Sequence, residues 1–476
     1  MNDLSLIMPE ILLTGFVCLL LMVDVYRKPS SGDATFWTAV VSVGIVLVSI
    51  VTYWPAEKST GFSETLVIDP MSILLKLVLL ISLLFNFFYA REYFKRSDKG
   101  QSEFYILAIF SALGMMVLIS AQSLLTLYLG LELLSLSLYA MVAMERDSAL
   151  ASEAAMKYFI LGALASGMLL YGISMLYGVS GTLNLAELAE YSVRGDQSLL
   201  LVFGLVFVLV GISFKLGIAP FHMWVPDVYQ GASTPVTLFI SSAPKIAAFA
   251  MAIRVLVDGL PGLSIQWSAM LTILAVTSIA IGNVVAIAQT NIKRMLAYST
   301  ISHMGFLILG VIAATAQGYA ASMFYVIIYA ITSMSAFGII ILLVSKSKAP
   351  ELINDFAGLA KTRPWISFIS MVVIFSLAGV PPFAGFWAKW FVLKELIASG
   401  SVVVAAVAVI FSLIGAYYYL RVVKIMYFDE PAPDSHAGNQ PSLGTHVFTL
   451  NGALILFLGL FPGVLMHYCL VAMQAY

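Results

Sequence analysis

Long apolar segments follow one another along almost the whole of this 476-residue chain, and no other feature constrains its fold as strongly. A helix needs about 20 consecutive apolar residues to cross the hydrocarbon core of a bilayer. Hydrophobic residues make up 61% of the chain and charged residues only 10%, whereas soluble domains carry about 25% charged residues. The sequence therefore predicts an all-α polytopic membrane protein without a soluble domain.

Apolar windows predict about 14 transmembrane helices. The first seven are expected at residues 6–25, 36–54, 70–90, 104–120, 123–144, 151–177 and 199–230. The other seven are expected at residues 234–257, 267–289, 290–313, 318–344, 365–397, 402–428 and 446–472. Residues 181–198, between the sixth and seventh spans, are expected to form a short surface helix.

Basic residues are distributed unevenly between the two sides of the predicted bundle, which indicates its orientation because cytoplasmic loops collect Lys and Arg. With the N-terminus outside, the outer side carries only Lys58, Arg194, Arg254 and Lys394. The inner side carries Arg27, Lys28, Arg91, Lys95, Arg96, Lys99, Arg146, Lys293, Arg294, Lys346, Lys348, Lys361, Arg363, Arg421 and Lys424. Both termini, Met1 and Tyr476, are therefore predicted to be periplasmic in a bacterial inner (plasma) membrane.

The seventh apolar segment is too long for one simple crossing and contains a charge and a helix breaker. Lys215 lies near its middle, and Gly217 and Pro220 follow within five residues. Proline removes a backbone donor and clashes with the preceding turn, so the helix is expected to kink or unwind there. A charge beside a broken helix is a common ion site in transporters. A lysine that extends toward the membrane surface beside a packing kink is the simpler alternative.

A second copy of this break occurs in the twelfth segment. Residues 217–221 read GIAPF and residues 379–383 read GVPPF, each within an overlong span that carries a lysine. Five spans separate equivalent points, and an odd number inverts the second copy, as in many secondary transporters. The copies are unequal, because Lys215 precedes its break and Lys389 follows its own.

Few charges lie inside the predicted spans, and each costs about 2.5–3.5 kcal/mol at the centre of a membrane helix. Glu132 is the one acid at the centre of a span. The basic residues inside spans are Lys76, Lys157, Lys215, Lys245 and Lys389. Several lysines and a carboxylate at mid-membrane are hard to explain as packing, and such groups suit a proton relay.

The individual candidates differ in depth, and a structural role is an alternative for each. Lys76 lies near the outer end of its span and can extend toward the membrane surface. Lys157 lies in the inner third of its span, which favours function. Lys293 begins the tenth span and could be an ordinary inside anchor. His303, near mid-depth, and His222, just past the first break, can exchange protons near neutral pH or simply be hydrogen-bonded.

Three stretches together carry a resemblance to a known family. Residues 214–237 read FKLGIAPFHMWVPDVYQGASTPVT, residues 289–306 read QTNIKRMLAYSTISHMGF, and residues 376–390 read SLAGVPPFAGFWAKW. The chain resembles the subunit N family of bacterial respiratory complex I, one of the antiporter-like membrane subunits. The resemblance implies two inverted five-helix repeats, at residues 101–258 and 259–428. Flanking helices would occupy residues 1–100 and 429–476.

The resemblance also implies roles for single residues. Glu132 matches a fifth-helix glutamate that pairs with the lysine of the first broken helix, here Lys215. Lys157 matches a sixth-helix lysine on the same side. Lys245 matches the central lysine between two half-channels, and Lys389 matches the lysine of the second broken helix. Lys293 and His303 complete the set of candidate proton-transfer residues. Pro244 has no place in the family pattern and is expected to bend the eighth span.

The implied function is proton translocation coupled to electron transfer from NADH to quinone. No cofactor is expected in this subunit, since Cys18 and Cys469 stand alone; NAD, FMN, iron–sulfur clusters and quinone would belong to partner subunits. Expected partners are other membrane-arm subunits of complex I, including neighbouring antiporter-like subunits, and membrane lipids. The net charge of −1 gives no indication of a nucleic-acid partner. A stand-alone cation/proton antiporter and a non-conducting scaffold of the membrane arm are the alternatives.

Overall fold

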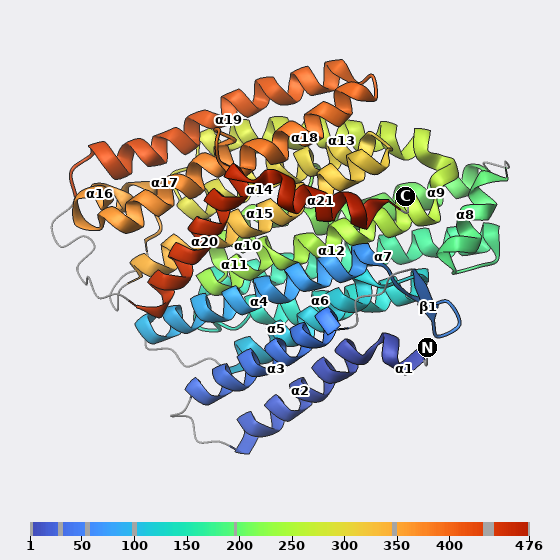
Figure 1. Ribbon diagram of the computed structural model, residues 1–476, viewed down its shortest axis with the longest axis horizontal. Coiled ribbons are helices and arrows are strands. Elements are labelled where there is room, and N and C mark those ends of the chain that lie inside the picture. The colour runs from blue at the N-terminus through green and yellow to red at the C-terminus, as the bar shows by residue number, and fades with distance from the viewer. Residues whose placement is uncertain are drawn as a thin grey trace.

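The computed structural model describes residues 3–26, 32–52, 58–97, 102–194, 198–344, 350–431 and 442–474, which form a bundle of helices (Figure 1). Seven residues used in the orientation argument lie outside the described residues: Met1, Arg27, Lys28, Lys99, Lys346, Lys348 and Tyr476.

The first half of the chain contains the helices α1 (Asp3–Leu6), α2 (Met8–Tyr26), α3 (Gly32–Thr52), α4 (Pro70–Ser97), α5 (Ser102–Ile119), α6 (Leu124–Val142), α7 (Ala149–Ser180), α8 (Leu185–Val193), α9 (Leu199–Leu216), α10 (Trp224–Gly231), α11 (Thr234–Ser241) and α12 (Ala243–Ala252). The second half contains α13 (Ser264–Ile287), α14 (Ile292–Ile312), α15 (Ala316–Leu343), α16 (Leu359–Thr362), α17 (Pro364–Ala378), α18 (Ala384–Ala398), α19 (Val402–Phe428), α20 (Leu443–Leu460) and α21 (Pro462–Met473).

Short elements complete the fold. A π-helical turn, η1 (Ile253–Gly259), continues α12, and 3-10 turns form η2 (Pro261–Leu263) and η3 (Ile353–Phe356). The strands β1 (Ser59–Gly61) and β2 (Leu66–Ile68) form an antiparallel hairpin with Thr60 opposite Val67. The sequence pattern did not predict this hairpin, because each strand is only three residues long.

Several long helices begin where a polar side chain caps the first turn. A side-chain oxygen at this position accepts a hydrogen bond from one of the backbone N–H groups that the helix leaves unpaired. This arrangement occurs at Ser123 before α6, Ser148 before α7, Ser198 before α9, Asn291 before α14 and Thr315 before α15. The helix boundaries therefore follow local sequence signals as well as hydrophobicity.

The helices match the predicted spans, with one correction. Among the described residues, 13 helical stretches are long and apolar enough to cross a membrane. The predicted twelfth span is the pair α17 and α18, each too short by itself, and the predicted surface helix is α8. The predicted fourteenth span at residues 446–472 is not one helix. It is interrupted at Phe461, and Pro462 begins the separate helix α21.

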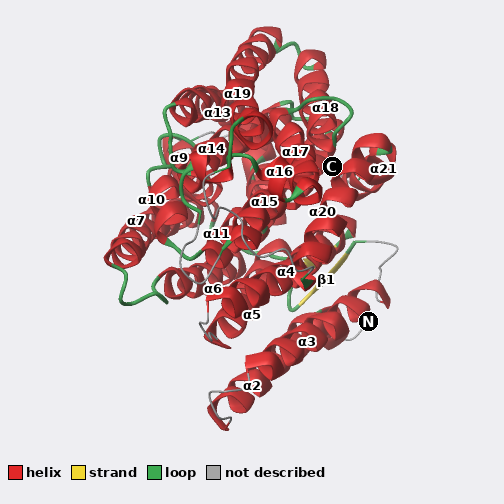
Figure 2. Cartoon of the chain, turned by 90° about the vertical axis from the view of Figure 1, so that its left-hand side faces the viewer, coloured by secondary structure: helices red, strands yellow, loops and turns green. Residues whose placement is uncertain are grey.

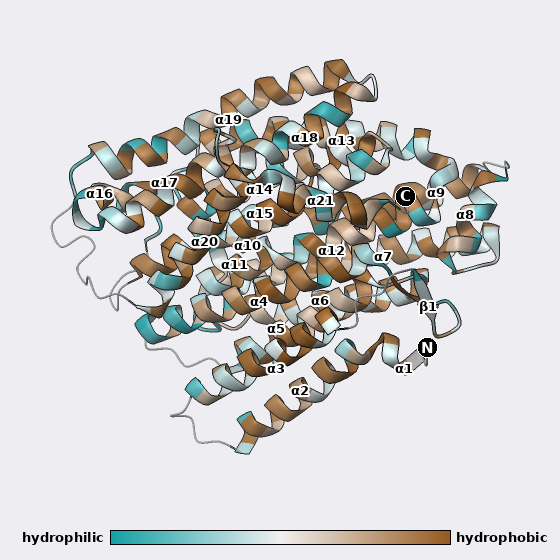
Figure 3. Cartoon of the chain, in the orientation of Figure 1, coloured by the Kyte–Doolittle hydropathy of each residue, from teal (hydrophilic) through white to brown (hydrophobic). Residues whose placement is uncertain are grey.

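The bundle has a buried centre and two exposed edges. In both views α15 lies in the middle, α2 and α3 lie at one edge, and α19 lies at the opposite edge (Figures 1 and 2). The described residues of α14 and α15 are almost all buried, and those of α12 are all buried. Hydrophobic residues cover the middle of the helices and hydrophilic residues gather toward the two ends of the bundle (Figure 3), as expected for a membrane protein. The chain is thus a multi-pass membrane protein.

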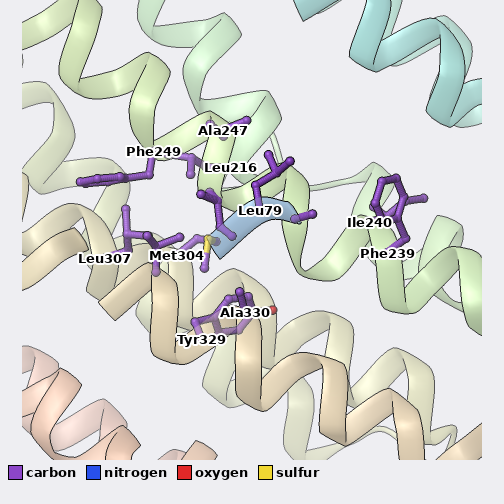
Figure 4. Close-up of a cluster of buried hydrophobic side chains, with 14 of the residues drawn as sticks. Leu79, Leu216, Phe239, Ile240, Ala247, Phe249, Met304, Leu307, Tyr329 and Ala330 are labelled. Atoms are coloured by element: carbon purple, nitrogen blue, oxygen red, sulfur yellow. The ribbon is translucent and has the colours of Figure 1, made fainter. Parts of the chain in front are cut away.

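The eighth span is interrupted next to the core. α11 ends at Ser241, and α12 starts with Pro244 in its first turn, which leaves Ser242 outside either helix. The bend expected from Pro244 is therefore confirmed. Leu216, at the end of α9, belongs to a cluster of buried side chains to which α4, α11, α12, α14 and α15 also contribute (Figure 4).

Candidate functional site

Two broken helices end in the same way. Gly217 follows the last residue of α9 with φ +78°, and Gly379 follows the last residue of α17 with φ +85°. At each break the N–H of the residue after the glycine donates to the carbonyl five residues back, that of Ser213 or of Phe375, at 3.0 Å, and the glycine N–H donates to the carbonyl three residues back, at 3.0–3.1 Å. This is the Schellman arrangement, which needs a left-handed residue and therefore favours glycine. Both predicted breaks are confirmed.

A lysine ammonium occupies the carbonyl end of each first half-helix. Lys245 of α12 donates from Nζ to the carbonyls of Lys215 and Leu216, at 3.1 and 2.9 Å. Lys389 of α18 donates to the carbonyl of Ala378 at 2.9 Å and to Ser412 Oγ at 2.9 Å. The last carbonyls of a helix are unpaired and carry the negative end of its dipole, so a cation is stabilised there. By contact geometry, Lys389 corresponds to Lys245 rather than to Lys215.

Lys215 has a different partner, a hydroxyl of α6. Its Nζ donates to Ser135 Oγ at 2.6 Å. Glu132 lies one turn away on the same helix and accepts a hydrogen bond from Ser166 of α7. The described residues contain no direct ion pair between Glu132 and Lys215, and Ser135 stands at the point of contact. Ser135 could have been found from sequence, since it follows Glu132 at the i+3 spacing of one helix face.

Lys157 is not brought to Glu132 or Lys215. It lies nine residues before Ser166 on α7, about 13 Å along the helix axis. Its Nζ pairs with Asp227 of α10 at 2.8 Å and with Glu153 at 2.7 Å, and its side chain is 42% exposed. Asp227, which the sequence argument missed, also pairs with Arg294 of α14 at 2.7 Å.

Lys293 and His303 both lie on α14. Lys293 Nζ donates to the carbonyl of Ala232 at 2.8 Å, just past the end of α10. His303 is buried, with Nδ1 2.7 Å from the Tyr325 hydroxyl and Nε2 3.0 Å from the Tyr419 hydroxyl. One turn further, the ring of Phe306 lies 5.3 Å from Lys389 Nζ. His303 is therefore placed near the second break by contacts that only packing reveals.

Two spaces of very different size border the second break. A cavity beside His303 is also lined by Ser376 and Gly385, which flank residues 379–383. A mainly apolar pocket between α18 and α19 opens beside Lys389, with Ser412 on its wall. His222, at the first break, is buried, and its Nδ1 has no hydrogen-bond partner among the described residues.

Two basic residues differ from the sequence expectation. Lys76 does not extend toward the membrane surface: it is 3% exposed and its Nζ lies 2.5 Å from Glu10 Oε1 of α2. Arg254, counted with the outer side, is fully buried and pairs with Asp69 at 2.7 Å and Asp258 at 3.0 Å. Burial raises the pKa of the Asp69 carboxyl, but the Arg254 guanidinium outweighs burial and lowers that pKa to about 2. Hydrophobicity alone could not show that these side chains have partners.

Comparisons with known proteins identify the family. The family described as "NADH:quinone oxidoreductase/Mrp antiporter, TM" matches residues 121–415. NADH-quinone oxidoreductase subunit N of Thioalkalivibrio sulfidiphilus is 51% identical, over 98% of this chain and 97% of that protein. The chain belongs to the subunit N family of NADH-quinone oxidoreductase. Subunit N of Coxiella burnetii is 49% identical to this family member, over 96% of this chain and 95% of that one.

Solved structures agree with this family assignment. A chain of respiratory complex I from Thermus thermophilus superposes with a TM-score of 0.83 at 32% identity, covering 96% of this subunit N family member and 98% of that chain. A chain of the Mrp complex from a Dietzia species has a TM-score of 0.86 at 22% identity, and the superposition covers 98% of this chain and 97% of that chain. The latter likeness establishes a shared fold only.

Proposed function

We propose that this chain is the proton-translocating, antiporter-like membrane subunit of a bacterial NADH:quinone oxidoreductase. The observation that carries the proposal is the position of Lys245 and Lys389, each at the carbonyl end of a broken half-helix within an apolar bundle. Their partners among the described residues are carbonyls, a hydroxyl and aromatic rings, with no carboxylate in ion-pair contact. Intramembrane ionisable groups of this kind mark ion and proton pathways.

The contacts suggest how the first half of the relay works. Lys245 binds the main-chain carbonyl of Lys215 itself, so both ammonium groups belong to the same end of α9. Two positive charges in a poorly solvated site repel each other. Glu132 supplies a negative charge one helical turn from Ser135, the partner of Lys215. A change in charge at Glu132 would therefore act on Lys215 first and on Lys245 next.

His303 and Lys389 would form the second half of the proton relay. The His303 ring contacts two tyrosine hydroxyls, and Phe306, one turn along α14, faces Lys389. Hydroxyl and imidazole groups can pass protons. Lys293 and Lys157, which bind the carbonyl end and the side of α10, would support the relay by holding that helix.

The repeats and partners follow the same proposal. The matched breaks support two inverted repeats, at residues 101–258 and 259–428. Redox chemistry with NAD, FMN, iron–sulfur clusters and quinone would occur in partner subunits and reach this non-redox translocase as conformational or electrostatic change. Its partners would be other membrane-arm subunits, including neighbouring antiporter-like subunits, and the lipids of the bacterial inner membrane.

Substitution of the two carbonyl-bound lysines tests the proposal. Lys245→Met and Lys389→Met are introduced into the assembled complex in membrane vesicles. Proton uptake is measured per complex, and the amount of complex is taken from NADH oxidation by an artificial acceptor. Each substitution is expected to slow proton uptake by about tenfold or more, as for loss of a positioned proton carrier. Unchanged proton uptake in both variants would indicate a non-conducting scaffold, and purification without redox partners would indicate a stand-alone antiporter.

A further inference from the structure

The short helix α10 lies between two non-helical segments, and its side chains contact α7 and α14. Residues 217–223 separate it from α9, and Ala232 follows it in extended conformation. It is only eight residues long, and an isolated helix of that length has little stability of its own. Side-chain contacts must therefore determine where α10 lies.

Asp227 is the charged centre of these contacts. Its Oδ2 accepts from Lys157 of α7 at 2.8 Å, and its Oδ1 accepts from Arg294 of α14 at 2.7 Å. Arg294 also donates to Gln230 on the next turn of α10, at 3.1 Å. One carboxylate thus connects α10 to two helices on either side. The Asp227 and Arg294 side chains are only 29–30% exposed, where ion pairs are less screened than at an open surface.

Trp224 lies one turn from Asp227 and contacts the end of α9. Its indole Nε1 donates to the carbonyl of Phe214 at 3.1 Å, across the break. Its ring stacks on Tyr158 of α7 at 4.6 Å between centroids and 19° between planes. Lys245 Nζ lies 5.1 Å from the centroid of the indole ring, a distance at which an ammonium is attracted to an aromatic face.

We propose that Asp227 is a positioning residue that, through Trp224, holds the Lys245 ammonium against the carbonyl end of α9. The inference rests on the proposed function of Lys245 in proton transfer. Lys157 and Arg294 are the cations that hold Asp227, so Lys157 acts as part of this clamp rather than as a proton carrier. α10 is then the element through which a shift of α7 or α14 reaches Lys245.

Substitutions of Asp227 and Trp224 in the assembled complex test this assignment. Asp227→Asn keeps the shape but loses the charge, and Trp224→Leu loses the aromatic face. Each is expected to slow proton uptake per assembled complex by about tenfold, because a small displacement of a reacting group has effects of this size. Asp227→Glu restores the charge and is expected to recover most of the rate. Glu153→Gln is the matched control, because it removes the other partner of Lys157 and leaves both Asp227 ion pairs in place.

A purely structural role for Asp227 would lower the amount of complex and leave the rate per complex unchanged. That result for Asp227→Asn, or an equal loss in Glu153→Gln, would overturn the inference. If Asp227→Asn does not assemble, Trp224→Leu decides, since an unchanged rate per complex in that variant has the same meaning. When Lys245→Met is already present, Asp227→Asn is expected to slow proton uptake little further, because both residues act at one site. Fully independent losses of rate in the two variants would contradict the inference. If Lys245→Met alone is harmless, the proposed function itself fails, whereas a harmful Lys245→Met with a harmless Asp227→Asn rejects only this inference.

Discussion

At the scale of single residues, the buried or half-buried lysines of this chain have three kinds of partner. Main-chain carbonyls bind Lys245, Lys293 and Lys389, a hydroxyl binds Lys215, and carboxylates bind Lys76 and Lys157. A carboxylate neutralises the ammonium and fixes it, whereas carbonyls and hydroxyls solvate it without a full opposite charge. Lys215, Lys245 and Lys389, which have neutral partners and lie next to the two breaks, are therefore the better candidates for proton carriers.

Glu132 and Lys215 are expected to act as one unit through Ser135. Glu132→Gln removes the negative charge one turn from the Lys215 contact and should slow proton uptake, while Lys215→Met should be at least as harmful. The double variant should cost little more than Lys215→Met alone, because groups that act together have non-additive effects of about 0.5–3 kcal/mol. The effects of the single and double variants are measured as proton uptake per assembled complex. Lys394→Gln, at an exposed site, is the control. Strictly additive losses of proton uptake in the Glu132 and Lys215 variants would contradict the expectation that the two residues act together.

The Glu10–Lys76 pair gives a prediction about stability. Both side chains are at least nine-tenths buried, and removal of one partner leaves an unpaired buried charge at a cost of about 3–5 kcal/mol. Lys76→Met alone should therefore reduce the amount and thermal stability of the assembled complex. Glu10→Leu combined with Lys76→Met should recover most of the loss, because both desolvated charges are gone. A double variant as unstable as the single one would contradict this explanation.

At the scale of helices, the two breaks depend on their glycines and on what lies against them. A Cβ at Gly379 would lie 2.9 Å from Lys389 Cδ and 3.1 Å from its Nζ. At Gly217 it would lie 2.8 Å from Val225 Cγ2. Each glycine therefore provides both the left-handed turn and the space in which a half-helix end meets its neighbour.

Gly379→Ala is expected to impair the second half of the relay. A left-handed conformation costs a residue with a side chain about 1–2 kcal/mol, and the added methyl group must displace the Lys389 side chain. Proton uptake per assembled complex should fall, with some loss of assembly. Gly463→Ala in α21 is the matched control, since its Cβ would meet nothing within 4 Å and its φ is not positive. Equal behaviour of the two variants would indicate that the Gly379 turn is not required.

At the scale of the whole molecule, the described ends of the chain agree with an even number of crossings. The N and C marks lie toward the same end of the bundle as α8 and β1, and α16 lies at the opposite end (Figure 1). The membrane side of each end remains a prediction from the uneven distribution of basic residues.

Reporter fusions measure that orientation. Alkaline phosphatase folds only on the periplasmic side, so a fusion after Tyr476 is expected to be active. A fusion within residues 345–363 is expected to be inactive, because that loop is predicted to be cytoplasmic. Reversed activities would overturn the orientation.

Local physical effects made the helices and the breaks predictable from the sequence. Long apolar segments require helices in a bilayer, and a proline in the middle of a helix removes a backbone donor and clashes with the preceding turn. The breaks at Gly217–Phe221 and Gly379–Phe383, the bend at Pro244 and the surface helix α8 were therefore expected at the right places. Resemblance to known sequences added the family, which the comparisons bear out.

Only the tertiary structure decided the partners of the charges. Lys157 meets Asp227 across 70 residues of sequence, and Lys76 meets Glu10 across 66. Such contacts depend on how helices rotate and slide against one another, which hydrophobicity does not specify because most faces of a buried membrane helix are apolar. For the same reason, the sequence determined that Lys245 and Lys389 lie inside spans, and packing decided that both bind the end of a broken helix.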